Sequence, residues 1–269
     1  MSELVKDGVR LWYTQAGAGS PTMLFAHGWC CDHTYFQPQL DYFQENHRVL
    51  AVDLRGHGQS DAPDQDYSVV GFARDLLWMM DQLGLDGVVI VGHSLGGLAA
   101  LQAAAMNPSV VAAAVLVDPA PVIRPKGLAE TAAPFIEALQ GPLYQQVARD
   151  HVEQVLFARG DDGELKARVV EAMCSTPQHV MASAMEQIFA WDGERAASTC
   201  AVPVLNISAA SPLGDVARFR QLCPQLVTGQ TVGSGHFNQL LAPEQVNSMI
   251  ERFLPLLEDT RHDRGLRRK

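Results

Sequence analysis

The sequence predicts an α/β fold with a mostly parallel central sheet, helices on both faces of the sheet and a helical cap insertion. Two patterns lead to this expectation. Short apolar runs alternate with helical patterns along most of the chain, and one long stretch has helical patterns alone. The composition agrees, because 269 residues that are 47% hydrophobic and 19% charged can bury one large core.

Seven short apolar runs bounded by turn residues are predicted as strands. They span residues 10–15, 21–26, 48–52, 88–91, 110–117, 202–207 and 226–232. Helical patterns lie between most of these runs; in 68–84, for example, apolar residues recur three and four positions apart. This alternation predicts a parallel sheet. Only a short turn at 17–21 separates the first two runs, so we expect them to pair as an antiparallel hairpin.

Residues 121–200 break the alternation. Four helical patterns follow one another at 129–140, 145–157, 164–174 and 180–189, with no convincing strand between them. We therefore predict an α/β core formed by 1–120 and 201–260, and a helical cap formed by 121–200. Ligands of open α/β sheets bind beyond the carboxyl ends of the strands, where this insertion would form a lid.

Charge and composition argue against several classes of function. A net charge of −10 does not suit nucleic acid, and only the tail 261–269 is basic, which we expect to be disordered. The N-terminus lacks a signal-peptide pattern, and no run reaches the roughly 18 apolar residues of a membrane helix. Five cysteines without metal-ligand spacing predict free thiols in a reducing cytoplasm. We expect a cytoplasmic protein that acts on a small molecule; its oligomeric state is not readable from the sequence.

The strongest chemical signal is the motif Gly-His-Ser-Leu-Gly at 92–96. It follows the apolar run 88–91 and precedes an alanine-rich helical pattern, so a strand is expected to turn sharply into a helix at Ser94. Glycines two residues before and after the serine permit the close backbone approach that such a turn needs. The pattern predicts Ser94 as a catalytic nucleophile.

A serine nucleophile needs a base, and His236 is the best of nine histidines for this role. It lies in the glycine-containing segment 233–237, directly after the last predicted strand and before a helical pattern. A loop at this place can direct an imidazole back to the sheet edge that carries Ser94. The chain order of serine, acid and histidine also fits this type of turn.

Two carboxylates compete to orient His236. Asp118 ends the predicted strand 110–117 and precedes a proline, whereas Asp215 follows the next strand. An aspartate at either place can also simply cap a turn. We favour Asp118 because of its position and keep Asp215 as the alternative.

The turn at 27–29, His-Gly-Trp, follows the predicted strand 21–26. The backbone amides of Trp29 and of Leu95, the residue after the nucleophile, are predicted to form an oxyanion hole. The segment 53–60 closes the next strand, and we assign it a structural role as a buried polar turn.

Together these motifs resemble those of the α/β-hydrolase superfamily over residues 9–257. The resemblance implies the fold and a site of serine, acid and histidine. Many members carry the acid in a Gly-x-x-Asp-Pro-like turn, where this chain has Ala-Ala-Ser-Pro at 209–212. Other branches place the acid one strand earlier, which matches Asp118. The serine at 94 differs from the aspartate that haloalkane dehalogenases and epoxide hydrolases use at this turn.

The expected function is a carboxylesterase-like serine hydrolase that cleaves a small, largely apolar carboxylic ester or lactone through an acyl-enzyme. No cofactor or metal is expected, because the sequence has no nucleotide-binding or zinc motif. Hydrolysis of an amide or of a C–C bond is left open.

The segment 27–33, His-Gly-Trp-Cys-Cys-Asp-His, is also similar to one in cofactor-free dioxygenases of this fold that cleave N-heteroaromatic rings. That resemblance implies a His/Asp dyad that deprotonates the substrate, a serine that only positions it, and substrate contacts from His27 and His33. His33 fits a polar position at a helix start equally well. A third class, a receptor on the same fold, is disfavoured by the complete set of Ser94, His236 and a carboxylate.

Overall fold

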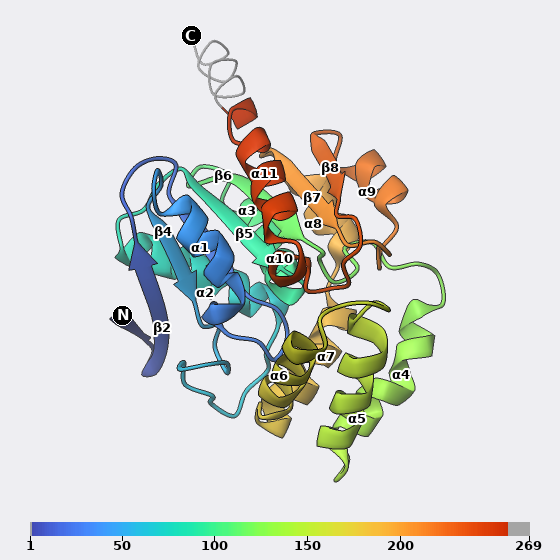
Figure 1. The fold of residues 1–269 in the computed structure, drawn as a ribbon. Coiled ribbons are helices and arrows are strands. Elements are labelled where there is room, and N and C mark those ends of the chain that lie inside the picture. The colour runs from blue at the N-terminus through green and yellow to red at the C-terminus, as the bar shows by residue number, and fades with distance from the viewer. Residues whose placement is uncertain (1, 258–269) are drawn as a thin grey trace.

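The computed structural model describes residues 2–257, which form an eight-stranded sheet with helices on both faces (Figure 1). The strands are β1 Ser2–Lys6, β2 Val9–Ala16, β3 Met23–Ala26, β4 Val49–Val52, β5 Val88–His93, β6 Val111–Val117, β7 Val204–Ser208 and β8 Leu226–Gln230. Their order across the sheet is β1-β2-β4-β3-β5-β6-β7-β8. All neighbours from β4 to β8 are parallel, whereas β1, β2 and β4 pair antiparallel. The predicted fold class and the seven predicted strands are confirmed.

One predicted pairing is wrong: β2 and β3 do not form a hairpin, because β4 lies between them. β3 and β4 are fully buried, so each needs a hydrogen-bonded neighbour on both edges, which a terminal hairpin would not provide. Residues 17–22 pass the end of β4 and connect β2 to β3, which lie two strand spacings apart. This distance is about 10 Å, and six residues are long enough to span it. The hairpin is formed by β1 and β2, with Asp7 and Gly8 at positive φ in its turn.

Two layers of helices cover the sheet. On one face lie α1 (Gln37–Phe43) and α11 (Pro243–Phe253); on the other lie α2 (Val69–Gln82) and α3 (Leu95–Met106), with α8 (Gly193–Thr199) packed against α3. Successive side chains of β3 point to opposite faces of the sheet. Phe25 packs in the core on the side of α1 and α11, and Leu24 packs in the core on the side of α2 and α3. Two shorter helices, α9 (Val216–Leu222) and α10 (Asn238–Leu241), precede and follow β8.

A group of helices follows β6 in the chain. It contains α4 (Leu128–Leu139), α5 (Tyr144–His151), α6 (Gly163–Cys174) and α7 (Gln178–Ala190), and Figure 1 shows it beyond one end of the sheet. A π-helical turn, Val152–Leu156, continues α5. These elements match the helical patterns predicted within 121–200. Within residues 2–257, no helix is long and apolar enough to cross a membrane. The basic tail predicted at 261–269 lies outside the described residues.

Candidate active site

Ser94 lies in the tight turn between β5 and α3. Its backbone has φ 51° and ψ −117°, and a positive φ is uncommon for serine. Gly92 and Gly96 permit the turn. A Cβ on Gly92 would lie 2.1 Å from the Gly96 carbonyl oxygen, and a Cβ on Gly96 would lie 2.1 Å from the Ala26 carbonyl oxygen. Neither glycine can therefore carry a side chain without moving backbone, and the predicted geometry around Ser94 is present.

We expect Gly96→Ala to lower the free energy of unfolding by about 3 kcal/mol or to prevent folding, because its methyl group overlaps backbone atoms of β3. Urea unfolding followed by circular dichroism measures this effect. Gly163→Ala is the matched control, since a Cβ there meets nothing within 4 Å. Equal stabilities of the two variants would contradict the packing described for the turn.

The imidazole of His236, in the loop after β8, lies against Asp118 at the end of β6. His236 Nδ1 donates a hydrogen bond to Asp118 Oδ2 at 2.6 Å, and Asp118 Oδ1 accepts one from the Ala209 amide at 2.7 Å. Both side chains are buried, so this pair is shielded from water. With the proton on Nδ1, the neutral ring presents Nε2 as an acceptor, which is what a general base requires.

Asp215, the alternative acid, lies elsewhere. It is exposed at the start of α9, where its carboxylate accepts a hydrogen bond from the Arg218 amide at 2.9 Å and caps the helix. Of the two candidates, only Asp118 is brought to His236.

The loop that carries His236 is held from two sides. His93 Nε2 donates to the His236 carbonyl oxygen at 2.9 Å, and the two rings lie 4.6 Å apart. Burial lowers the pKa of His93 well below its usual value, so this ring is neutral. From the other side, the carbonyl oxygen of Leu156 accepts from the His236 amide at 3.0 Å, and the carboxylate of Asp161 accepts from the Gly235 amide at 3.2 Å. These supports were not predicted from the sequence, although the place of His93 next to the serine was a signal for its role.

The amides of Trp29 and Leu95 stand on the two segments that flank Ser94. Neither has a hydrogen-bond partner within residues 2–257. Leu95 is the first residue of α3, and the first amides of a helix have no partner inside it. The turn before Trp29 contacts the serine closely, since a Cβ on Gly28 would lie 3.1 Å from Ser94 Cβ. Two amides without a partner thus flank Ser94, and their role as an oxyanion hole stays a prediction.

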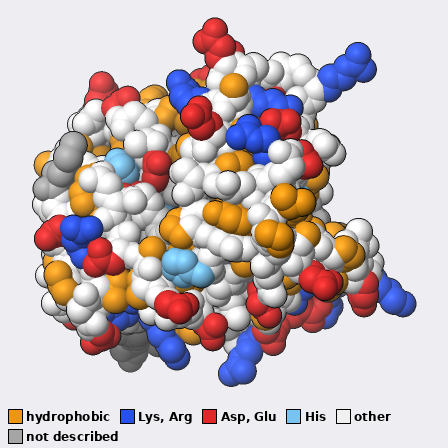
Figure 2. Space-filling view, turned by 90° about the horizontal axis from the view of Figure 1, so that it is seen from below, with side chains coloured by type: hydrophobic (Ala, Val, Ile, Leu, Met, Phe, Trp, Pro, Cys, Tyr) orange, Lys and Arg blue, Asp and Glu red, His pale blue; other side chains and the backbone are white. Residues whose placement is uncertain are grey.

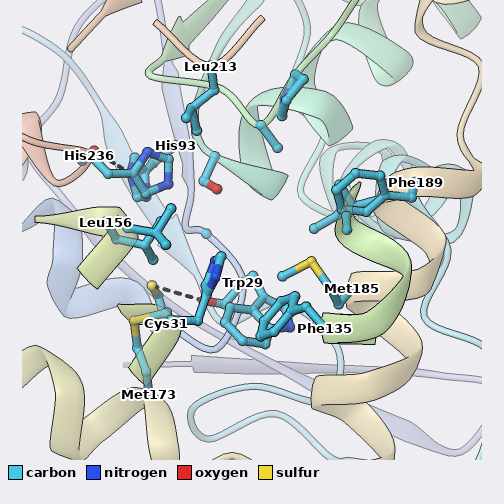
Figure 3. A pocket seen from close by; sticks show the side chains of 18 of the residues that line it. Trp29, Cys31, His93, Phe135, Leu156, Met173, Met185, Phe189, Leu213 and His236 are labelled. Atoms are coloured by element: carbon cyan, nitrogen blue, oxygen red, sulfur yellow. Dashed lines mark hydrogen bonds between the residues drawn. The ribbon is translucent and has the colours of Figure 1, made fainter. Parts of the chain in front are cut away.

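Ser94 and His236 open onto a cavity of about 390 Å³ (Figure 3). Figure 3 shows His236 beside His93 on one wall, Trp29 and Phe135 on another, and Phe189 across from the imidazoles. The Ser94 hydroxyl makes no hydrogen bond within residues 2–257. In ligand-free active sites, the hydrogen bond between a nucleophile and its base is often long and shortens only when substrate binds.

The mouth of this cavity is apolar. Val155 and Leu213 line the cavity and are 55% and 36% exposed. Figure 2 views the molecule from below and shows hydrophobic side chains among charged ones on the face seen there. Within residues 2–257, no group of three or more His, Cys, Asp or Glu side chains is arranged to hold a metal ion.

Comparison with known proteins identifies the family. The family model described as the alpha/beta hydrolase fold matches residues 21–162, more than half of the chain. The chain belongs to the α/β-hydrolase family. Over 113 residues this α/β hydrolase is 36% identical to the dihydrolipoyllysine-residue acetyltransferase component of an acetoin cleaving system from Cupriavidus necator, which covers 42% of this chain and 30% of that protein. Over 114 residues it is 35% identical to 2-(acetamidomethylene)succinate hydrolase from Mesorhizobium japonicum, covering 42% and 41%.

The chain therefore matches well under half the length of these two relatives. Among solved structures, the enol-lactonase from Burkholderia xenovorans superimposes with a TM-score of 0.83 over 94% of this chain and 100% of that one. At 21% sequence identity, this likeness shows the fold alone.

In this α/β hydrolase, the predicted substrate-binding residues His27 and His33 lie in polar contacts between two loops. His27 is fully buried; its Nε2 accepts from the Leu54 amide at 3.0 Å, and burial lowers its pKa. His33 donates from Nδ1 to Asp53 at 2.9 Å and packs on Trp12. Neither lines the cavity. Both histidines connect the turn after β3 to the segment after β4, whose structural role was predicted.

Proposed function

We propose that this protein is a serine hydrolase that cleaves a small, largely apolar carboxylic ester or lactone through an acyl-enzyme. The observation that carries the proposal is the 2.6 Å hydrogen bond from His236 Nδ1 to Asp118, which leaves Nε2 free at the wall of the cavity that Ser94 also lines. Serine is a weak nucleophile on its own, and an imidazole with a fixed tautomer supplies the base that it needs.

In the proposed cycle, Ser94 Oγ attacks the carbonyl carbon while His236 Nε2 takes the hydroxyl proton. The amides of Trp29 and Leu95 hydrogen-bond the oxyanion that develops. His236 then gives its proton to the leaving oxygen, and the acyl group stays on Ser94. A water molecule, deprotonated by the same imidazole, releases the acid and restores the serine. Asp118 remains ionised and stabilises the imidazolium in both halves of the cycle.

A phosphonate probe tests the role of Ser94. Reaction with a p-nitrophenyl alkylphosphonate is expected to release about one equivalent of p-nitrophenol and to leave a phosphonyl group on Ser94 that peptide mass spectrometry locates. Ser94→Ala is expected to remain unlabelled and to lose hydrolysis of p-nitrophenyl esters.

The same samples separate this proposal from the dioxygenase alternative. Wild-type protein that consumes oxygen with a hydroxyquinolone, leaves esters intact and takes up no phosphonyl group would support the dioxygenase and exclude the serine hydrolase. The proposal is supported by the place of His33, which the alternative would use to contact the substrate and which does not line the cavity.

A further inference from the structure

The wall of the cavity contributed by the α4–α7 helices carries an imidazole that the proposed cycle does not use. His151, the last residue of α5, lines the same cavity as Ser94 and His236. Its ring makes no hydrogen bond within residues 2–257, and it is partly exposed at a cavity whose other walls are mostly apolar. A ring nitrogen that faces a cavity without a protein partner can form a hydrogen bond to a ligand that enters the cavity.

Packing holds this imidazole in place. The ring of His151 stacks on Phe135 with centroids 4.2 Å apart and an angle of 21°, and it meets Trp29 edge-on at 6.3 Å. Trp29 is itself fixed, because its indole N–H donates to the Met181 carbonyl oxygen at 2.8 Å. The π-helical turn 152–156 follows directly, and such turns occur frequently at functional sites. A ring held in this way loses little freedom when it binds a ligand.

His151 is an uncharged group at neutral pH. Burial and, to a smaller extent, the nearby imidazole of His236 together lower its pKa to about 4. The neutral ring offers one N–H donor and one nitrogen acceptor. No Lys, Arg, Asp or Glu is among the described residues that line the cavity, so no side chain there would neutralise a charged substrate.

We propose that His151 determines the specificity of this cavity: it selects uncharged substrates whose apolar body carries a hydroxyl, keto or ring N–H group that hydrogen-bonds the imidazole. This inference rests on the proposed hydrolase function and names the substrate class of that site. Phe135 and Trp29 would contact the apolar body beside this group, while the carbonyl of the substrate lies at Ser94.

Binding to the Ser94→Ala variant tests the inference without turnover. The ligands are ethyl 3-phenylpropanoate, its 3-hydroxyphenyl and 4-hydroxyphenyl derivatives, and its 4-carboxyphenyl derivative, each titrated by calorimetry at pH 7.5. At least one hydroxyl derivative is expected to bind about threefold to tenfold more tightly than the parent, the gain from one neutral hydrogen bond. The carboxylate derivative is expected to bind more weakly than the parent.

A second substitution, His151→Phe in the Ser94→Ala variant, keeps a stacked ring and removes the hydrogen bond. The hydroxyl derivatives should then bind no more tightly than the parent ester. His179→Phe makes the same change at an exposed histidine of α7 outside the cavity and should alter none of the affinities. The inference is overturned if neither hydroxyl derivative exceeds the parent, if the advantage survives His151→Phe, or if the carboxylate binds best. Failure of the hydrolase proposal is read separately, from absent phosphonyl labelling of Ser94.

Discussion

Asp118→Asn is expected to lower kcat for ester hydrolysis about 10⁴-fold with little change in KM. An amide at this position donates as well as accepts, so His236 can place its proton on Nε2 and lose the acceptor that takes the serine proton. The imidazolium of the reaction would also lose the negative charge beside it. Stopped-flow or steady-state assays with a p-nitrophenyl ester measure the effect, with circular dichroism to verify folding.

Asp215→Asn is the matched control for this substitution. Its carboxylate caps α9 at the surface, so we expect activity close to wild type and a loss of stability below about 1 kcal/mol. If Asp215→Asn lost activity while Asp118→Asn kept it, the hydrogen bond observed at His236 would not be the one that catalysis uses.

The parts of the fold that the sequence predicted well are those with local signals. Each buried strand is a short apolar run, and the turn at Ser94 shows its two glycines within five residues. The pairing error at β2 and β3 arose because strand order depends on burial across the sheet, which adjacent residues do not reveal. β1 was missed because its residues alternate between partly and fully exposed and form no apolar run.

Some residues of the candidate site could likewise be predicted from local signals in the sequence, and others could not. Ser94, His236 and Asp118 each follow a strand, and parallel strands bring their carboxyl ends to one edge, so their meeting could be predicted. His27 and His33 also follow a strand, but their ring nitrogens are already hydrogen-bonded, His27 to a backbone amide and His33 to Asp53. The role of such a histidine depends on which partner lies within 3 Å. His151 could not be predicted, because nothing in a helix pattern tells which face meets the cavity.

Several imidazoles around the site are kept neutral by burial, and this links the site to the stability of the whole protein. His57 packs 5.2 Å from His27 and donates from Nδ1 to the Arg55 carbonyl oxygen, while its Nε2 is buried without a partner within residues 2–257. Burial lowers the pKa of His57 to about 3 and that of His151 to about 4, and it also lowers those of His27 and His93.

The protein is therefore expected to lose stability steeply below pH 6.5. An unfolded chain protonates its histidines near pH 6.5, whereas these four rings stay neutral in the folded state, so the unfolded state binds more protons as the pH falls. Each ring lowers the free energy of unfolding by about 1.4 kcal/mol per pH unit until the pH reaches the pKa of that ring in the folded state. His57 and His151 alone lower the free energy of unfolding by about 5 kcal/mol between pH 6.5 and 4.5, and the total for a protein is roughly 5–15 kcal/mol.

Urea unfolding at pH 7.5, 6.5, 5.5 and 4.5 measures this loss. His57→Gln removes one of the rings, so it should be less stable than wild type at pH 7.5 but lose about 1.4 kcal/mol less per pH unit below 6.5. His151→Phe should flatten the profile in the same way down to about pH 4, where the folded imidazole of the wild type itself begins to protonate. Because the two rings lie in different parts of the structure, their effects on the slope should add. Identical slopes in all three proteins would mean that the acid loss comes from carboxylates, and that these imidazoles are not held neutral by the fold.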